Sequence, residues 1–465
     1  DSMSGTFENI SVPPTLVSFA ITASDVHDVM TPEAKEAGHI LAEVQIKKDQ
    51  FKVFDFDHLQ KQYNAIQDLM KQKKIYSAYT VKDGGVIEAV CKMSFGNGLG
   101  AAFNTDYSLA SYVEKNYGNI IVEVKSEKDL VGLDYRVVAT LNDSEKFSYG
   151  MDTISIQEAY AINKAPLESV YPTREKAPTQ DIKVAECKTR STLKAKQYIE
   201  TPLVVIPVFP GTNCEYDSKR AFEKAGAKVE LVLIRNKTEE MLKTSIDELE
   251  NAIKRANIVM LPGGFSAGDE PEGSGKFIAT VLRNPRLKAA ISDLLDNRDG
   301  LMIGICNGFQ ALIKLGLVPY GEICGQKADS PTLTFNTIGR HISKMVYTKV
   351  VTNKSPWLRE AELGGVYTNP ASHGEGRFVA SQEWIEKLFK NGQVATQYVN
   401  LNGEPTMDDR FNPNGSYYAI EGITSPDGRV LGKMAHSERI GDNIAKNIYA
   451  KQDQKIFESG VEYFK

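Results

Sequence analysis

The residues with the clearest chemical potential are residues 304–308, GICNG, where a cysteine stands between two glycines. They follow the apolar run 301–303 and precede a helix-like segment, 309–315, so the pattern predicts a strand that turns sharply into a helix. Such a tight turn leaves no room for a Cβ atom on either side. At the start of a helix, free N–H groups and the helix dipole favour the thiolate of Cys306. The pattern predicts a nucleophilic cysteine, although most cysteines are buried packing residues.

A histidine and a glutamate near the C-terminus could activate this cysteine. His436 and Glu438 follow residues 429–433, which have the composition of a strand. An imidazole beside a thiol can take its proton, and a carboxylate behind the ring fixes the tautomer. We therefore expect Cys306 as nucleophile, His436 as base and Glu438 as the orienting group. The alternatives are a surface histidine and a surface salt bridge between Glu438 and Arg439.

A second glycine-rich turn could stabilise negative charge in the reaction. The apolar run 258–261 predicts a strand, and the sequence PGGFSAGD follows it directly. A turn at the carboxyl end of a parallel strand can direct N–H groups at an oxyanion. We therefore expect Gly263, Gly264 and Phe265 to lie at an oxyanion site, with the N–H of Asn307 as the second donor.

Four motifs, in the same order along the chain, resemble those of class I glutamine amidotransferases. They resemble more narrowly the glutaminase domains of the phosphoribosylformylglycinamidine synthase family. The motifs are residues 210–215 (PGTNCE), 262–266 (PGGFS), 304–310 (GICNGFQ) and 372–377 (SHGEGR). The resemblance implies hydrolysis of L-glutamine to glutamate and ammonia by Cys306, His436 and Glu438. The related PfpI-like family usually has a histidine directly after the elbow cysteine, where this chain has Asn307.

The resemblance also implies residues that bind glutamine. These are Gln310, Ser372 and His373, and the alternative for His373 is that it holds the glycine-rich turn 374–376. Cys214 falls in a strand-end loop near the expected site. Because it lacks a glycine on each side, we expect it to have a packing role.

The first half resembles part of the ATP-binding region of the same synthases, which is built from modules similar to aminoimidazole ribonucleotide synthetase. The resemblance is carried by residues 1–5 (DSMSG), 12–20 (VPPTLVSFA), 83–85 (DGG) and 96–100 (GNGLG). The chain has no initiator methionine, so we expect the C-terminal part of a large-type synthase, with a processed N-terminus as the alternative. The resemblance implies ATP and Mg²⁺ for the full-length synthase but no cofactor in this part, and upstream synthetase modules as partners.

The helices and strands expected from the sequence indicate an α/β fold in two domains. We expect an α+β domain over residues 1–163, similar to the C-terminal domain of aminoimidazole ribonucleotide synthetase, then a proline-containing linker over 164–201. We expect a class I glutamine amidotransferase domain with a doubly wound parallel sheet over 202–465. Short strands after residue 333 should bring His373 and His436 to the same edge. The strands expected are 120–124, 135–139, 203–209, 229–234, 258–261, 345–351 and 417–423, and the helices are 59–70, 86–93, 216–225, 246–254 and 287–295.

Composition narrows the function classes. The net charge of −5 over 465 residues gives no basic footprint for nucleic acid and no polybasic membrane patch. No apolar run has the length of a membrane helix. Five cysteines without a Cys-x-x-Cys pair fit a reducing cytoplasm and indicate no metal site. The glycines of 96–100 lack the lysine of a phosphate-binding loop and predict a tight turn. Two rival functions stay open: an amidotransferase that feeds another acceptor, and a non-catalytic partner-docking module.

Overall fold

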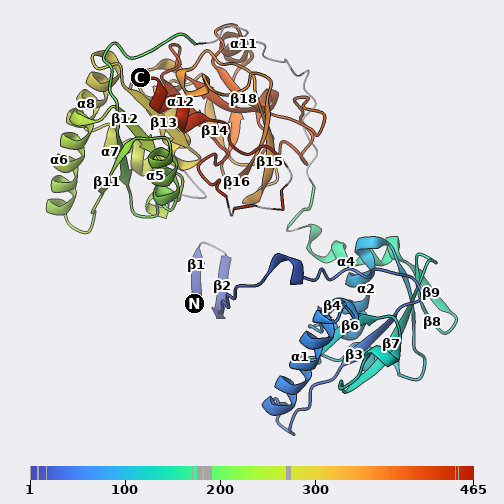
Figure 1. The fold of residues 1–465 in the computed structure, drawn as a ribbon. Coiled ribbons are helices and arrows are strands. Elements are labelled where there is room, and N and C mark those ends of the chain that lie inside the picture. The colour runs from blue at the N-terminus through green and yellow to red at the C-terminus, as the bar shows by residue number, and fades with distance from the viewer. Residues whose placement is uncertain are drawn as a thin grey trace. The chain divides into compact units, whose positions relative to one another are not determined.

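The computed structural model divides into two compact units, residues 1–170 and 171–465, and each is described by itself (Figure 1). The structure describes residues 2–7, 10–16, 18–169, 171–174, 182, 191–268, 274–442, 444–445, 447–448 and 450–465. No helix in this described part combines the length and the hydropathy that a membrane span requires.

The first unit is built around a seven-stranded, mainly antiparallel sheet in the order β4-β6-β3-β7-β5-β8-β9. Successive residues of β3 point to opposite faces: Leu41 packs in the same cluster as Met93 of α2, and Ala42 packs with Ile66 of α1. The two helices therefore cover opposite faces of the sheet. The strands are β1 (Ser2–Phe7), β2 (Ile10–Leu16), β3 (Ile40–Val44), β4 (Ile75–Thr80), β5 (Gly100–Phe103), β6 (Ile120–Val124), β7 (Tyr135–Asn142), β8 (Lys146–Tyr149) and β9 (Asp152–Ser155), and the helices are α1 (Phe56–Lys71), α2 (Gly85–Asn97), α3 (Leu109–Tyr112) and α4 (Ile156–Glu168).

Local sequence signals explain these elements well. The Asp55 carboxylate accepts a hydrogen bond from the N–H of His58 and caps α1. The glycines of 96–100 form the predicted tight turn, with Gly98 in the left-handed conformation at the end of α2. Residues 164–168, expected in the linker, instead continue α4, and Pro166 is accommodated inside that helix. Most of the remaining linker, including Cys187, lies outside the described residues.

The second unit contains a nine-stranded sheet in the order β11-β10-β12-β13-β20-β19-β18-β15-β16. Strands β11, β10, β12, β13 and β20 are parallel, as predicted, and the remaining four run antiparallel to their neighbours. The strands are β10 (Leu203–Val208), β11 (Lys228–Leu233), β12 (Ile258–Leu261), β13 (Leu301–Ile305), β14 (Thr332–Thr334), β15 (Ile342–Val350), β16 (Val366–His373), β17 (Arg377–Val379), β18 (Val394–Tyr398), β19 (Ile420–Thr424) and β20 (Val430–Lys433), and the helices are α5 (Glu215–Lys224), α6 (Glu239–Arg255), α7 (Lys276–Leu282), α8 (Pro285–Asp296), α9 (Asn307–Leu315), α10 (Leu317–Tyr320), α11 (Gln382–Lys390) and α12 (Ile456–Glu462).

The sheet order places a ligand site at one edge. The chain passes from β10 to its neighbour β11 on one side and from β12 to its neighbour β13 on the other side. The direction in which the chain moves across the sheet therefore reverses between β10 and β12. Ligands in such sheets bind beyond the carboxyl ends of the strands at this point. The short strands expected after residue 333 continue the same sheet as β15, β16, β18 and β19. The N–H of His436, after β20, donates to the carbonyl oxygen of Pro370 in the edge strand β16 at 2.8 Å, which brings β16 back over this edge.

Candidate active site

Cys306 occupies the sharp turn between β13 and α9. Its φ of 54° and ψ of −107° are unusual for a residue with a side chain. A Cβ atom on Gly304 would lie 2.6 Å from the carbonyl carbon of Gly308, and one on Gly308 would lie 1.9 Å from the carbonyl oxygen of Leu261. Both glycines are therefore required by the close passage of the backbone. The predicted elbow is confirmed, and it holds Cys306 at the first residue before the helix.

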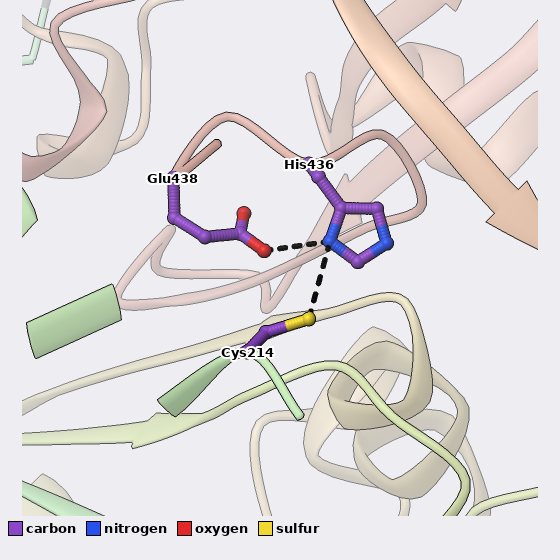
Figure 2. A group of neighbouring side chains, drawn as sticks. All are labelled: Cys214, His436 and Glu438. Atoms are coloured by element: carbon purple, nitrogen blue, oxygen red, sulfur yellow. Dashed lines mark hydrogen bonds and ion pairs between the residues drawn. The ribbon is translucent and has the colours of Figure 1, made fainter. Parts of the chain in front are cut away.

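His436 and Glu438 form a buried pair in the turn that follows β20. Nδ1 of His436 lies 2.6 Å from Oε1 of Glu438 (Figure 2). An ionised carboxylate only accepts hydrogen bonds, so Nδ1 carries the proton and Nε2 keeps its lone pair. Among the described residues, Nε2 has no hydrogen-bond partner. The ring is therefore in the tautomer that a general base needs.

Gly263 brings the histidine and the cysteine together. The position that a Cβ atom on Gly263 would occupy lies 2.7 Å from Cε1 of His436 and 3.5 Å from Cβ of Cys306. The same position lies 3.1 Å from Sγ of Cys214. Loops that follow β10, β12, β13 and β20 therefore converge at one point.

Electrostatics favour the ionised form of Glu438. Burial alone would raise its pKa, but the attraction and hydrogen bond of His436, with a further contribution from Arg439, outweigh burial and hold the pKa below its usual value. The carboxylate therefore stays charged near neutral pH and can stabilise an imidazolium when the ring takes a proton.

A second buried charge pair supports the turn that carries His436. Nζ of Lys433 lies 3.3 Å from Oε1 of Glu421, and both side chains are buried. Oε1 of Glu421 also accepts hydrogen bonds from the N–H groups of Met434 and Ala435, at 3.0 and 2.6 Å. Lys433 in turn donates to the carbonyl oxygen of Ala435. This network fixes the backbone immediately before His436.

Cys214 lies beside the same imidazole, directly before the first residue of α5. Its Sγ is 3.8 Å from Nδ1 of His436, and Nη2 of Arg439 donates to Sγ at 2.9 Å. The expectation of a packing role is thus incomplete, because the buried thiol also makes polar contacts. Burial and the nearby Glu438 raise its pKa to about 12, so Cys214 is a neutral thiol at neutral pH. The sulfur, the imidazole and the carboxylate are ligand types that can hold a metal ion.

The expected oxyanion donors are only partly supported. The N–H of Phe265 donates to the carbonyl oxygen of Gly211 at 2.9 Å and is therefore not directed at an oxyanion here, while a place for Phe265 at the glutamine site stays a prediction. The reason is that residues 211–213 and 263–265 pair as a short antiparallel bridge, which uses this N–H. The N–H of Gly264 makes no hydrogen bond within the described part of the chain. Asn307 is the first residue of α9. A donor role for its N–H and for that of Gly264 stays a prediction.

Gln310 and Ser372, both predicted to bind glutamine, make different contacts in the structure. Nε2 of Gln310 donates to the carbonyl oxygen of Glu375 at 2.6 Å, and its Oε1 accepts from the side chain of Asn307 at 2.9 Å. This buried amide ties α9 to the loop after β16. Ser372 lies closer to the nucleophile, because its carbonyl oxygen is 3.5 Å from Sγ of Cys306. Contact of either side chain with glutamine stays a prediction.

His373 lies under the glycine-rich turn. A Cβ atom on Gly376 would come within 2.3 Å of the ring, and Nδ1 pairs with Oδ1 of Asn336 at 3.2 Å. Burial, followed by the positive potentials of His436 and His341, lowers the pKa of His373 to about 3. The ring is therefore neutral near pH 7. This packing supports the alternative in which His373 holds the turn, while its contact with glutamine stays a prediction.

Three further residues contribute to the site in ways that were not predicted from the sequence. Arg439 contacts Cys214, Glu421 holds the turn before His436, and His341 places Nε2 3.1 Å from Oγ of Ser372. The ring of His341 also lies near that of Phe265, with 6.1 Å between the ring centroids. Only Arg439 carried a local signal, as a neighbour of Glu438; the others are brought in by strand pairing.

Comparison with known proteins identifies the family of residues 201–464. Residues 201–464 match the family described as the CobB/CobQ-like glutamine amidotransferase domain. The chain is 33% identical over 288 residues to the phosphoribosylformylglycinamidine synthase subunit PurQ of Methanococcus maripaludis, with 57% of this chain and 97% of that protein covered. It is 35% identical over 271 residues to the same subunit of Treponema denticola, with 54% and 95% covered. The solved structure of PurLQS from Thermotoga maritima aligns with 27% identity and a TM-score of 0.41, covering 57% of this chain and 100% of that one.

Proposed function

The chain belongs to the family of CobB/CobQ-like glutamine amidotransferase domains, and on this premise we propose that it is the glutaminase part of a phosphoribosylformylglycinamidine synthase. It hydrolyses L-glutamine to glutamate and ammonia, and the ammonia serves the ATP-dependent amidation of formylglycinamide ribonucleotide in purine biosynthesis. Relatives named as a subunit of this synthase match nearly along their whole length. The observation that carries the proposal is the convergence of Cys306 with the buried His436–Glu438 pair at Gly263.

The first half of the reaction forms a thioester. Nε2 of His436 takes the proton of Cys306, and the thiolate attacks the side-chain amide carbon of glutamine. The N–H groups of Gly264 and Asn307 stabilise the oxyanion that forms on the amide oxygen. His436 then gives its proton to the leaving nitrogen, so ammonia departs and a γ-glutamyl thioester remains on Cys306.

The second half releases glutamate. Nε2 of His436 takes a proton from water, and the hydroxide attacks the thioester carbon. The same two N–H groups stabilise the second oxyanion. Collapse of this intermediate breaks the C–S bond, glutamate leaves, and Cys306 regains its proton. Glu438 holds Nδ1 throughout and stabilises the imidazolium without itself taking the proton.

The remaining parts of the enzyme belong to the proposal as well. Upstream synthetase modules would use the ammonia, and ATP and Mg²⁺ would act there, with no cofactor needed for the glutaminase chemistry of Cys306. We expect the protein to act in the cytoplasm, where a free nucleophilic thiol stays reduced. Nucleic acid and membrane are not expected partners, since the net charge is −5.

Glutamate release by the purified chain tests the proposal. Cys306→Ala and His436→Ala are expected to abolish turnover, and Glu438→Ala to lower it by about 10³- to 10⁴-fold, because the tautomer is no longer fixed. Cys324→Ala is the matched control, since this exposed cysteine lies away from the site. Normal turnover by the His436 variant would show that another group is the base. A wild-type chain without turnover would favour the non-catalytic docking module.

Supplying the upstream modules, ATP and different acceptors separates the two enzymatic alternatives. Amidation of formylglycinamide ribonucleotide supports the proposed synthase. Amidation only of another acceptor would contradict it while leaving the glutaminase assignment intact.

A further inference from the structure

Cys214, His436 and Glu438 form a cluster of metal-binding side chains within the active site (Figure 2). One ligand atom from each, namely Sγ, Nδ1 and a carboxylate oxygen, lies within 4.8 Å of the other two, and all three residues are buried. In the described part of the chain, it is the one such group of three or more residues. Cys214 lies more than 200 residues before His436 and Glu438 in the sequence, which is why the spacing along the chain indicated no metal site.

The chemistry and the distances fit zinc. Thiolate, imidazole and carboxylate are its usual protein ligands, and a thiolate with a carboxylate would neutralise the charge of the ion. In a tetrahedral site the sulfur and the nitrogen lie about 3.5 Å apart, and a nitrogen and an oxygen about 3.3 Å. Here Sγ of Cys214 is 3.8 Å from Nδ1 of His436, and Nδ1 is 2.6 Å from Oε1 of Glu438. The nitrogen-to-oxygen distance is shorter than zinc needs, so binding requires the carboxylate to withdraw from Nδ1.

We propose that Cys214, His436 and Glu438 bind Zn²⁺, and that the bound ion inhibits glutamine hydrolysis. Zinc binding is independent of the proposed function, whereas inhibition rests on it. When the ion binds, Cys214 loses its thiol proton and Nδ1 of His436 loses its proton, and both protons pass to solvent. Bonds form from zinc to sulfur, nitrogen and carboxylate oxygen. No oxidant or reductant is involved.

Inhibition follows because zinc would occupy one nitrogen of the His436 ring and thereby change the protonation of the other. A neutral imidazole that binds a metal through Nδ1 carries its proton on Nε2. Nε2 can then no longer accept the proton of Cys306. The ion therefore removes the base while leaving Cys306 itself unbound. Zinc held by Cys306 and Nε2 would be a different site, and the two can be told apart by substitution.

The surroundings can accept the ion. Nη2 of Arg439 donates to Sγ of Cys214 at 2.9 Å, and such a bond can persist because a metal-bound thiolate still accepts hydrogen bonds. Oε2 of Glu438 is buried and has no hydrogen-bond partner among the described residues. Glu438 also borders a cavity of about 500 Å³ together with Ile440 and Arg220.

A competition titration of zinc chloride against a chromophoric chelator tests the site directly on the full chain. The wild type and Cys306→Ala are expected to bind one zinc ion with equal affinity. Cys214→Ala and Cys214→Ser are expected to bind it at least about 100-fold more weakly. Cys324→Ala serves as the control for the other thiols, and circular dichroism reports whether each variant is folded. Unchanged binding by both Cys214 variants, or loss of binding in Cys306→Ala, would overturn the proposal.

Glutamate release at increasing zinc concentration tests inhibition separately. Each protein is compared with its own zinc-free rate, and the chelator EDTA should restore that rate. Cys214→Ala is expected to need at least about 100-fold more zinc for half-inhibition. Equal inhibition of wild type and Cys214→Ala would contradict the inhibitory role. If the chain did not hydrolyse glutamine at all, the proposed function would fail, while the titration would still decide whether zinc binds here.

Discussion

Gly263 and His436 lie so close together that the imidazole ring fills the space that a side chain at position 263 would need. The position of a Cβ atom on Gly263 is 2.7 Å from Cε1 of the imidazole. Contacts under 3.0 Å are essentially never made by a Cβ atom, so one of the two groups would have to move. The glycine predicted to belong to an oxyanion loop is thus required for a second reason: it allows the base to reach the elbow.

Gly263→Ala is therefore expected to lower the rate of glutamine hydrolysis by about 100-fold, because a displacement near 1 Å at a reacting group costs about that much. Gly441→Ala is the matched control, since its added Cβ would make only an ordinary contact at 3.4 Å. Steady-state kinetics of both variants provide the measurement. A Gly263 variant with wild-type kcat would show that the ring tolerates the methyl group or that His436 is not the base.

The buried pair of Glu421 and Lys433 should be costly to break. Glu421→Leu leaves Lys433 without its carboxylate partner and removes the acceptor of two N–H groups before His436. The free energy of unfolding should therefore fall by about 3–5 kcal/mol. Urea unfolding followed by tryptophan fluorescence reports this unit, because Trp357 and Trp384, the only two tryptophans, both lie in it. Glu362→Ala, which breaks an exposed pair with Lys451, is the control and should show no measurable change. Equal effects of the two substitutions would contradict the role of the buried network.

The buried ring of His373 should make the second unit sensitive to acid. Its folded pKa of about 3 lies below the unfolded value near 6.5, so the unfolded chain binds more protons between these two pH values. The stability this group contributes is complete above pH 6.5 and is lost as the pH falls towards 3. Between pH 7 and pH 5 the free energy of unfolding should fall by about 2 kcal/mol because of this group.

His373→Gln removes this titration, so the variant should lose about 2 kcal/mol less than the wild type over the same interval. Urea unfolding at pH 5 and pH 7 measures the difference. His27→Gln is the control, because that ring is exposed and lies in the first unit. Identical pH dependence in His373→Gln and the wild type would show that the ring is not buried in its neutral form.

The glutaminase should be gated by the synthetase modules. The residues expected to bind glutamine and the oxyanion lie on strand-end loops, which can hold a misaligned site until a partner orders them. The chain alone is therefore expected to hydrolyse glutamine slowly and to form no formylglycinamidine product. Adding the upstream segment with ATP, Mg²⁺ and acceptor should raise glutamate release at least about tenfold. A full rate in the isolated chain, or productive use of ATP by it, would contradict this prediction.

The sequence predicted best those elements that depend on neighbouring residues. Helix α1 has its cap at Asp55, and the elbow at Cys306 needs two glycines, so both were visible locally. Helix α6 begins at Glu239, well before the predicted start at residue 246, because its first turns are polar and exposed. Helix α7 was missed because it has only seven residues and follows a glycine-rich segment. Residues 417–419 form a 3-10 turn instead of the start of a strand, with positive φ at Tyr418 and Ala419.

Relationships between distant segments could not be predicted in the same way. The hydrogen bond from Phe265 to Gly211 depends on how two loops pair, and no local pattern fixes it. The contact between Cys214 and His436 joins the first strand of the parallel sheet to the last. Such contacts arise from the strand order, which places β10 and β20 around the same edge.

Labelling with a glutamine-like electrophile, followed by peptide mapping, tests the central claim that Cys306 is the nucleophile. The elbow places its sulfur at the start of α9 beside His436, whereas burial keeps Cys214 a neutral thiol. We expect a single label on Cys306, prevented by excess glutamine and absent in Cys306→Ala, with Cys214→Ala still labelled at Cys306. A label on Cys214 in the wild type, or modification of Cys306 that glutamine does not prevent, would contradict it.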